Sequence, residues 1–94
     1  MGELERYQQL ILPVLKRHFI KRAAIFGSFA KGATFADSDV DLLIEPEKDF
    51  TIFKMLMLEE EISEIIKRKV DIVEYSALKP SIKKEVLLSA ITIL

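Results

Sequence analysis

A short run of alternating acidic and apolar residues limits the folds open to this chain. Residues 39–44 read Asp-Val-Asp-Leu-Leu-Ile. In an extended strand successive side chains point to opposite faces, so Asp39 and Asp41 share one face while Val40 and Leu42 share the other. Two carboxylates about 6.6 Å apart on one strand face repel each other unless a cation binds between them. The run therefore predicts a strand with one buried face and one carboxylate face suited to Mg²⁺ or Mn²⁺.

A Gly-Ser pair lies shortly before this run. Gly27 and Ser28 follow the apolar stretch 23–26, which we predict to be a buried strand. Gly27 allows the backbone to approach a phosphate closely, and Ser28 would offer a hydroxyl and N–H donors at the start of a short helix. We expect residues 28–38 to form this turn of helix and a loop. The pair predicts a turn that holds the tail of a triphosphate.

The rest of the chain predicts helices and strands in alternation. Apolar residues at helical spacing predict a helix from Leu4 to His18, which Pro13 can kink or shorten, and a second helix capped by Thr51 that runs to the basic residues 67–69. Strands are expected at 40–45 and 70–75, a third helix at 80–88, and either a closing strand or more helix at 90–94. This order predicts an α/β (α+β) fold of one domain, residues 1–94, with a small mixed sheet and helices packed on one face.

A third acid extends the carboxylate pair. Asp71 lies between Val70 and Ile72, so its carboxylate points away from those two apolar side chains. If both strands bury their apolar faces against the same helices, Asp71 joins Asp39 and Asp41 on the open face. Three acids around two Mg²⁺ ions, with Mn²⁺ as an alternative, are the groups needed for in-line phosphoryl transfer. Asp39 and Asp41 would hold the metals, and Asp71 would orient or deprotonate the acceptor hydroxyl.

Composition excludes several other classes of protein. The formal net charge is −1, so we expect no binding of extended nucleic acid. The chain has no cysteine, which rules out disulfides, thiolate catalysis and Cys-based zinc sites. The N-terminal segment mixes charges into its apolar positions, unlike a signal peptide or a membrane span. We therefore expect a cytoplasmic protein that does not bind membranes.

The Gly-Ser and Asp-x-Asp motifs together resemble those of a known family. Gly27-Ser28, ten intervening residues and then Asp39-Val40-Asp41 match the signature of minimal nucleotidyltransferase (MNT) domains of the DNA polymerase β-like superfamily, and Asp71 stands where that family has its third acid. The resemblance covers nearly the whole chain. It implies a polymerase β-like palm fold, metal binding by Asp39, Asp41 and Asp71, and contacts from Gly27 and Ser28 to the β- and γ-phosphates. Lys31, where relatives often carry arginine, would add a single positive charge near the phosphates.

The resemblance also implies a partner. MNT domains are commonly encoded beside a helical HEPN protein, in toxin–antitoxin pairs whose MNT member modifies the toxin with AMP. We therefore expect a Mg²⁺-dependent nucleotidyltransferase (EC 2.7.7 type) that moves a nucleoside monophosphate, AMP from ATP in the first instance, to a hydroxyl of a HEPN partner. One alternative is a catalytically idle nucleotide-binding module that neutralises its partner by binding alone. Another is transfer to a small molecule, which would normally need an additional domain.

Two other motifs share some of these residues but lack essential positions. A P-loop fails because Ala33 occupies the place of the essential lysine, and an EF-hand fails because Leu42 replaces its glycine and Lys48 its glutamate. His18 falls on an apolar stripe and is interpreted as a packed or half-exposed side chain. The cations at 67–69 are interpreted as a helix C-terminus in preference to a phosphate site.

Two apolar stretches predict a surface for a partner. Residues 55–58, Met-Leu-Met-Leu, are more than one helix face can bury, and residues 90–94 can leave an open strand edge. Either a HEPN partner or a second copy of the chain would cover them.

Overall fold

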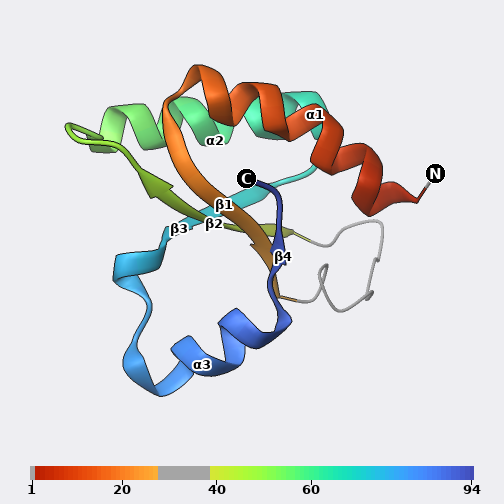
Figure 1. The fold of residues 1–94 in the computed structure, drawn as a ribbon. Coiled ribbons are helices and arrows are strands. Elements are labelled where there is room, and N and C mark those ends of the chain that lie inside the picture. The colour runs from red at the N-terminus through yellow and green to blue at the C-terminus, as the bar shows by residue number, and fades with distance from the viewer. Residues whose placement is uncertain (1, 28–38) are drawn as a thin grey trace.

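The fold is a four-stranded mixed sheet covered on one face by two long helices (Figure 1). The computed structural model describes residues 2–27 and 39–94. The elements in chain order are α1 (Glu3–Arg17), β1 (Ile20–Phe26), β2 (Val40–Pro46), α2 (Ile52–Ile66), β3 (Val70–Glu74), a 3₁₀ turn η1 (Tyr75–Ala77), α3 (Pro80–Ser89) and β4 (Ile91–Thr92). The expected turn of helix and loop at 28–38 lies outside the described residues.

The strands lie in the order β3-β2-β1-β4. β1 pairs antiparallel with both β2 and β4, whereas β2 and β3 are parallel. A parallel pair needs a crossover connection, and α2 supplies it between β2 and β3. The register of this parallel pair places Val40 opposite Val70 and Asp41 opposite Asp71.

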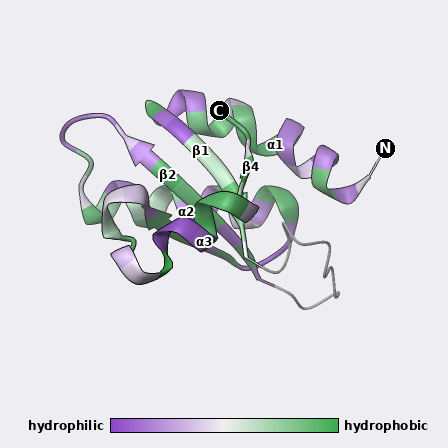
Figure 2. Cartoon of the chain, turned by 60° about the horizontal axis from the view of Figure 1, so that its bottom comes forward, coloured by the Kyte–Doolittle hydropathy of each residue, from purple (hydrophilic) through white to green (hydrophobic). Residues whose placement is uncertain are grey.

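The core lies between the sheet and the pair α1 and α2. Alternate residues of β2, namely Val40, Leu42 and Ile44, are completely buried and belong to the same apolar cluster as residues of both helices. The helices contribute Tyr7, Ile11, Val14 and Leu15 from α1 and Leu58, Ile62 and Ile66 from α2. Hydrophilic and hydrophobic stretches alternate along α1 in Figure 2, as expected for a helix with one apolar face. The predicted mixed sheet with helices on one face is thus confirmed for α1 and α2.

The third helix occupies a different position. α3 contacts β1, and the sheet separates it from α1 and α2 (Figure 1). After α3 ends, Ile91 and Thr92 pair with Ile25 and Ala24 of β1. The choice left open for residues 90–94 is therefore decided in favour of a strand at Ile91–Thr92.

The expected boundaries hold with small corrections. Thr51 caps α2, where its Oγ1 accepts a hydrogen bond from Lys54 N at 3.2 Å, and Lys67 ends the helix in the left-handed conformation. Pro13 lies inside α1 without shortening it. β1 begins three residues earlier than predicted, because Arg22 pairs with Glu45 across the sheet. β3 ends at Glu74, since Tyr75 begins the 3₁₀ turn.

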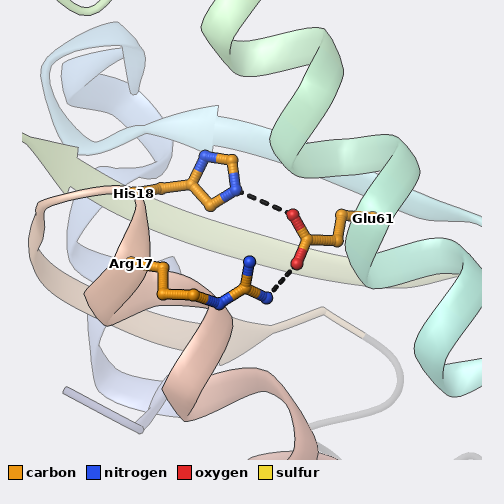
Figure 3. A network of polar contacts seen from close by, with 3 residues as sticks. All are labelled: Arg17, His18 and Glu61. Carbon is orange, nitrogen blue, oxygen red and sulfur yellow. Dashed lines mark hydrogen bonds and ion pairs between the residues drawn. The ribbon is translucent and has the colours of Figure 1, made fainter.

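A polar network joins the end of α1 to the middle of α2 (Figure 3). His18 Nε2 lies 2.9 Å from Glu61 Oε1, and Arg17 forms an ion pair with the other oxygen of Glu61. The His18 side chain is 17% exposed. The prediction of a packed or half-exposed histidine is confirmed, and its partner is a carboxylate on the neighbouring helix.

The described helices show no candidate for a membrane span: none of those in residues 2–27 and 39–94 combines the length and the apolar character that crossing a bilayer requires.

Candidate active site

Two of the three predicted acids lie side by side on the face of the sheet that α1 and α2 leave uncovered. Asp41 on β2 and Asp71 on β3 are register partners in a parallel pair. Their neighbours Val40, Leu42 and Val70 are buried in the core against the helices. Because side chains alternate along a strand, both carboxylates extend from the opposite face. Neighbouring strands are about 4.8 Å apart, which keeps these two carboxylates close.

Asp39 adds a third negative charge near this pair. It lies one residue before β2, in the sequence position that shares a face with Asp41. Partial burial raises the pKa of Asp41 above its ordinary value, and the charges of Asp71 and Asp39 raise it further. The charges of Asp39 and Asp71 thus both act on Asp41, and a bound cation would relieve this repulsion.

Gly27 lies directly against Asp41. It follows Phe26, the register partner of Asp41 on β1, and its φ of +77° is a left-handed conformation that favours glycine. A Cβ built on Gly27 would lie 2.3 Å from Asp41 Oδ2, much closer than any real contact. Glycine is thus required here both by the backbone conformation and by the closeness of the carboxylate.

Lys69 is a further residue of this region, which the sequence interpretation assigned to a helix end. Its Nζ lies 4.0 Å from Asp39 Oδ2, and both side chains are substantially exposed. Its neighbour Arg68 contacts α1, where its guanidinium lies 2.8 Å from Tyr7 Oη and 3.1 Å from Glu3 Oε1. The sequence could have indicated that Lys69 lies near the acids, because it stands two residues before Asp71. In an extended segment this spacing places both side chains on one face.

Two of the predicted phosphate-binding residues lie outside the described residues. Ser28 and Lys31 both fall in the range 28–38. The structure therefore brings together Gly27, Asp39, Asp41 and Asp71, and the roles of Ser28 and Lys31 stay predictions from the sequence.

The three acids have the oxygen ligands that a divalent cation prefers, but they do not form a complete coordination site by themselves. Within residues 2–27 and 39–94, no three or more His, Cys, Asp or Glu side chains are gathered in an arrangement that would hold a metal ion on their own. Mg²⁺ is usually bound through one or two carboxylates together with phosphate oxygens of the substrate and water. The pair Asp41 and Asp71, with Asp39 beside it, supplies the carboxylates for such a shared site.

Comparison with known proteins identifies the family. A sequence profile of the family "Polymerase beta, Nucleotidyltransferase" matches residues 9–94, most of the chain. The chain belongs to this family and is a nucleotidyltransferase. The resemblance seen in the Gly-Ser and Asp-x-Asp motifs is thereby confirmed.

Individual relatives narrow the likeness to the smallest members of the family. MJ0435 of Methanocaldococcus jannaschii, a proposed protein adenylyltransferase, is 31% identical over 97% of this chain and 98% of its own length. A solved structure described as a minimal nucleotidyltransferase superimposes with a TM-score of 0.84 at 32% identity, covering 97% of this chain and 95% of that chain. The fold, and nearly its full extent, is therefore that of a minimal nucleotidyltransferase.

A more distant structure shares the fold alone. It is the MNT antitoxin of a complex with a tri-AMPylated HEPN toxin from Shewanella oneidensis, with a TM-score of 0.74 and 13% identity. The match covers 96% of this chain and 71% of that chain.

Proposed function

We propose that this nucleotidyltransferase moves AMP from ATP to a hydroxyl of a HEPN partner protein, and that it acts as the antitoxin of such a pair. The observation that carries the proposal is the pairing of Asp41 with Asp71 on adjacent parallel strands, against Gly27. We favour transfer of AMP over transfer of another nucleoside monophosphate because the relative from Methanocaldococcus jannaschii is described as a proposed protein adenylyltransferase. The HEPN partner is proposed from the distant complex that shares the fold.

Each residue has a role in this proposal. Asp39 and Asp41, completed by Asp71, hold the divalent cations, Mg²⁺ in the first instance. Bound there, such cations neutralise charge on the triphosphate as it reacts. Gly27 lets the backbone approach the β- and γ-phosphates, where Ser28 and Lys31 add a hydroxyl and a positive charge.

The acceptor reaction is a single displacement at the α-phosphorus of ATP. The acceptor oxygen forms a new P–O bond while the bond to pyrophosphate breaks, and pyrophosphate leaves with its electron pair. Asp71 orients the acceptor hydroxyl and takes its proton. This assignment uses the place of Asp71 on β3, outside the Asp39–Asp41 segment and next to Asp41.

The alternative function expected from the sequence is a nucleotide-binding module that blocks its partner without chemistry. The two functions differ in what they require of Asp39. Neutralisation by transfer needs its carboxylate, whereas neutralisation by binding alone does not.

The test combines mass measurement with a neutralisation assay. A candidate HEPN partner protein is incubated with the chain, ATP and Mg²⁺, and its intact mass is then measured. We expect added AMP with the wild type and none with Asp39→Asn, which should also fail to neutralise the partner. An unmodified partner under every nucleotide, neutralised equally well by Asp39→Asn, would contradict transfer and favour the binding module.

A further inference from the structure

The outward face of α2 carries large apolar side chains that this chain does not cover. Phe53 is 76% exposed, Leu56 is 53% exposed and Met57 is 62% exposed, whereas Leu58 is completely buried. The expectation that residues 55–58 hold more apolar surface than one helix face can bury is therefore confirmed. Glu60 and Glu64 continue the same outward stripe one and two turns further along the helix, and both are exposed.

Met57 lies between two hollows of opposite charge. The first has a volume of about 270 Å³, and Arg17, Lys48 and Lys54 line it together with the apolar Phe19 and Phe50 and a single acid, Glu47. The second has a volume of about 190 Å³. Apart from Met57, its lining consists of Glu60, Glu61 and Glu64. Arg17 and Glu61 already pair within the chain. The remaining charges are Lys48 and Lys54, beside Glu47, at one end of the α2 face and Glu60 and Glu64 at the other.

This distribution of charge is complementary to itself. If two copies of α2 pack antiparallel about a two-fold axis at Met57, the residue three places before Met57 on one copy faces the residue three places after it on the other. Lys54 then faces Glu60 twice, and each acidic hollow covers the cationic hollow of the other copy. A two-fold interface has this property because the same surface patch serves both sides.

We infer that the outward face of α2 binds a second copy of this chain in an antiparallel, two-fold arrangement centred on Met57. A foreign acidic segment would match the end at Lys54 but be repelled at the end at Glu64, whereas a second copy satisfies both. The sheet lies between α2 and the face that carries Asp41 and Asp71, so both candidate active sites stay open in the dimer (Figure 1). The inference does not depend on the proposed transfer reaction.

Charge reversal tests the register as well as the surface. Purified wild type should sediment as a dimer at a concentration of about 200 µM. Lys54→Glu and Glu60→Lys should each raise the dissociation constant at least about tenfold, because each places two pairs of like charges across the axis. Mixing these two variants should restore a dimer of one copy of each, since both pairs are then of opposite charge. Lys83→Glu, an exposed charge reversal on α3, should leave the dimer unchanged.

A second variant guards against misfolding as a cause of dissociation. Lys54 Nζ donates to the carbonyl of Asp49 at 2.9 Å, so its replacement also removes a local contact. Met57→Asp changes only an exposed side chain and should give a folded monomer by circular dichroism and sedimentation. A wild type that stays monomeric, or dimers that survive Met57→Asp and both reversals, would overturn the inference. A monomeric wild type whose binding to a HEPN protein is lost in Met57→Asp would likewise overturn it and assign the face to that partner.

Discussion

Gly27 and Asp41 are so close that no side chain larger than hydrogen fits at position 27. The Cβ of any other residue would lie 2.3 Å from Asp41 Oδ2, and the left-handed φ of +77° adds backbone strain. In the proposed function, this close approach would make a phosphate held by the backbone at Gly27 a neighbour of a cation held by Asp41.

Gly27→Ala should therefore damage both stability and transfer. The left-handed conformation alone costs a non-glycine residue about 1–2 kcal/mol, and the displaced Asp41 should lower the transfer rate by about a hundredfold. Urea unfolding and the rate of AMP transfer measure the two effects. The control is Gly2→Ala, whose Cβ meets no atom within 4 Å and should leave the transfer rate unchanged. Because Gly2 caps α1, where alanine is less favourable, its cost in stability should be at most about 1 kcal/mol. Equal behaviour of the two variants would be inconsistent with the close contact.

Asp41→Asn should stabilise the protein when metal and nucleotide are absent. The raised pKa of Asp41 means that the fold favours its protonated form, so this stabilisation is present below the ordinary value of 3.8 and is lost as pH rises through the folded value. Asparagine resembles the protonated form at every pH. The variant should thus melt a few degrees higher at pH 7, with the difference vanishing near pH 3.

Adding Mg²⁺ and ATP should reverse this order. A ligand that binds only the folded state raises the melting temperature, and the wild type should gain more than Asp41→Asn. Unchanged melting of a folded wild type in millimolar Mg²⁺ and ATP would argue against the carboxylate site.

Glu61→Gln should lower stability near neutral pH and have little effect in acid. Hydrogen bonds from His18 and then Arg17 hold the pKa of Glu61 below its ordinary value of 4.5. A lowered carboxylate pKa contributes stability above the unfolded value, and this contribution is lost as pH falls through the folded value. The Arg17–Glu61 ion pair is partly exposed, so the free energy of unfolding should fall by at most about 1 kcal/mol at pH 7. Chemical unfolding at pH 7 and pH 3 measures it, and a deficit that is larger at pH 3 would contradict the network.

The sheet-facing side of α2 should dominate its contribution to stability. Ile62 is completely buried, so Ile62→Ala should cost about 2–5 kcal/mol in the free energy of unfolding. Ile52 lies on the same helix but is 64% exposed, and Ile52→Ala should change the free energy by no more than about 0.5 kcal/mol. Comparable losses from both substitutions would place the core elsewhere.

The sequence predicted most of the helices and strands because their apolar spacing is decisive. It predicted the shared face of Asp39 and Asp41 from the period of a strand, but the placement of Asp71 needed the order of the strands. The prediction that Asp71 joins Asp39 and Asp41 required both strands to bury their apolar faces against the same helices. The structure meets this requirement, because Val40 and Val70 belong to one core.

The differences from the prediction come from contacts between distant segments. β1 extends back to Ile20 because Arg22 pairs with Glu45 and stacks on Tyr75 at 4.6 Å, and charged residues gave no local sign of this strand. The strand at Ile91–Thr92 exists through its pairing with β1, so local sequence could not separate it from helix. Lys69 approaches Asp39 only once β2 and β3 are paired.

The most direct test of the account is the rate of AMP transfer from labelled ATP to the HEPN partner by three variants compared with wild type. Asp41→Asn and Asp71→Asn should each slow transfer at least about a hundredfold, through lost metal binding and lost proton transfer respectively. Glu45→Gln removes a carboxylate from the same strand as Asp41 but outside the trio, and it should react at nearly the wild-type rate. Wild-type rates for Asp41→Asn and Asp71→Asn, in proteins shown to be folded, would contradict the claim that these two paired carboxylates form the active site.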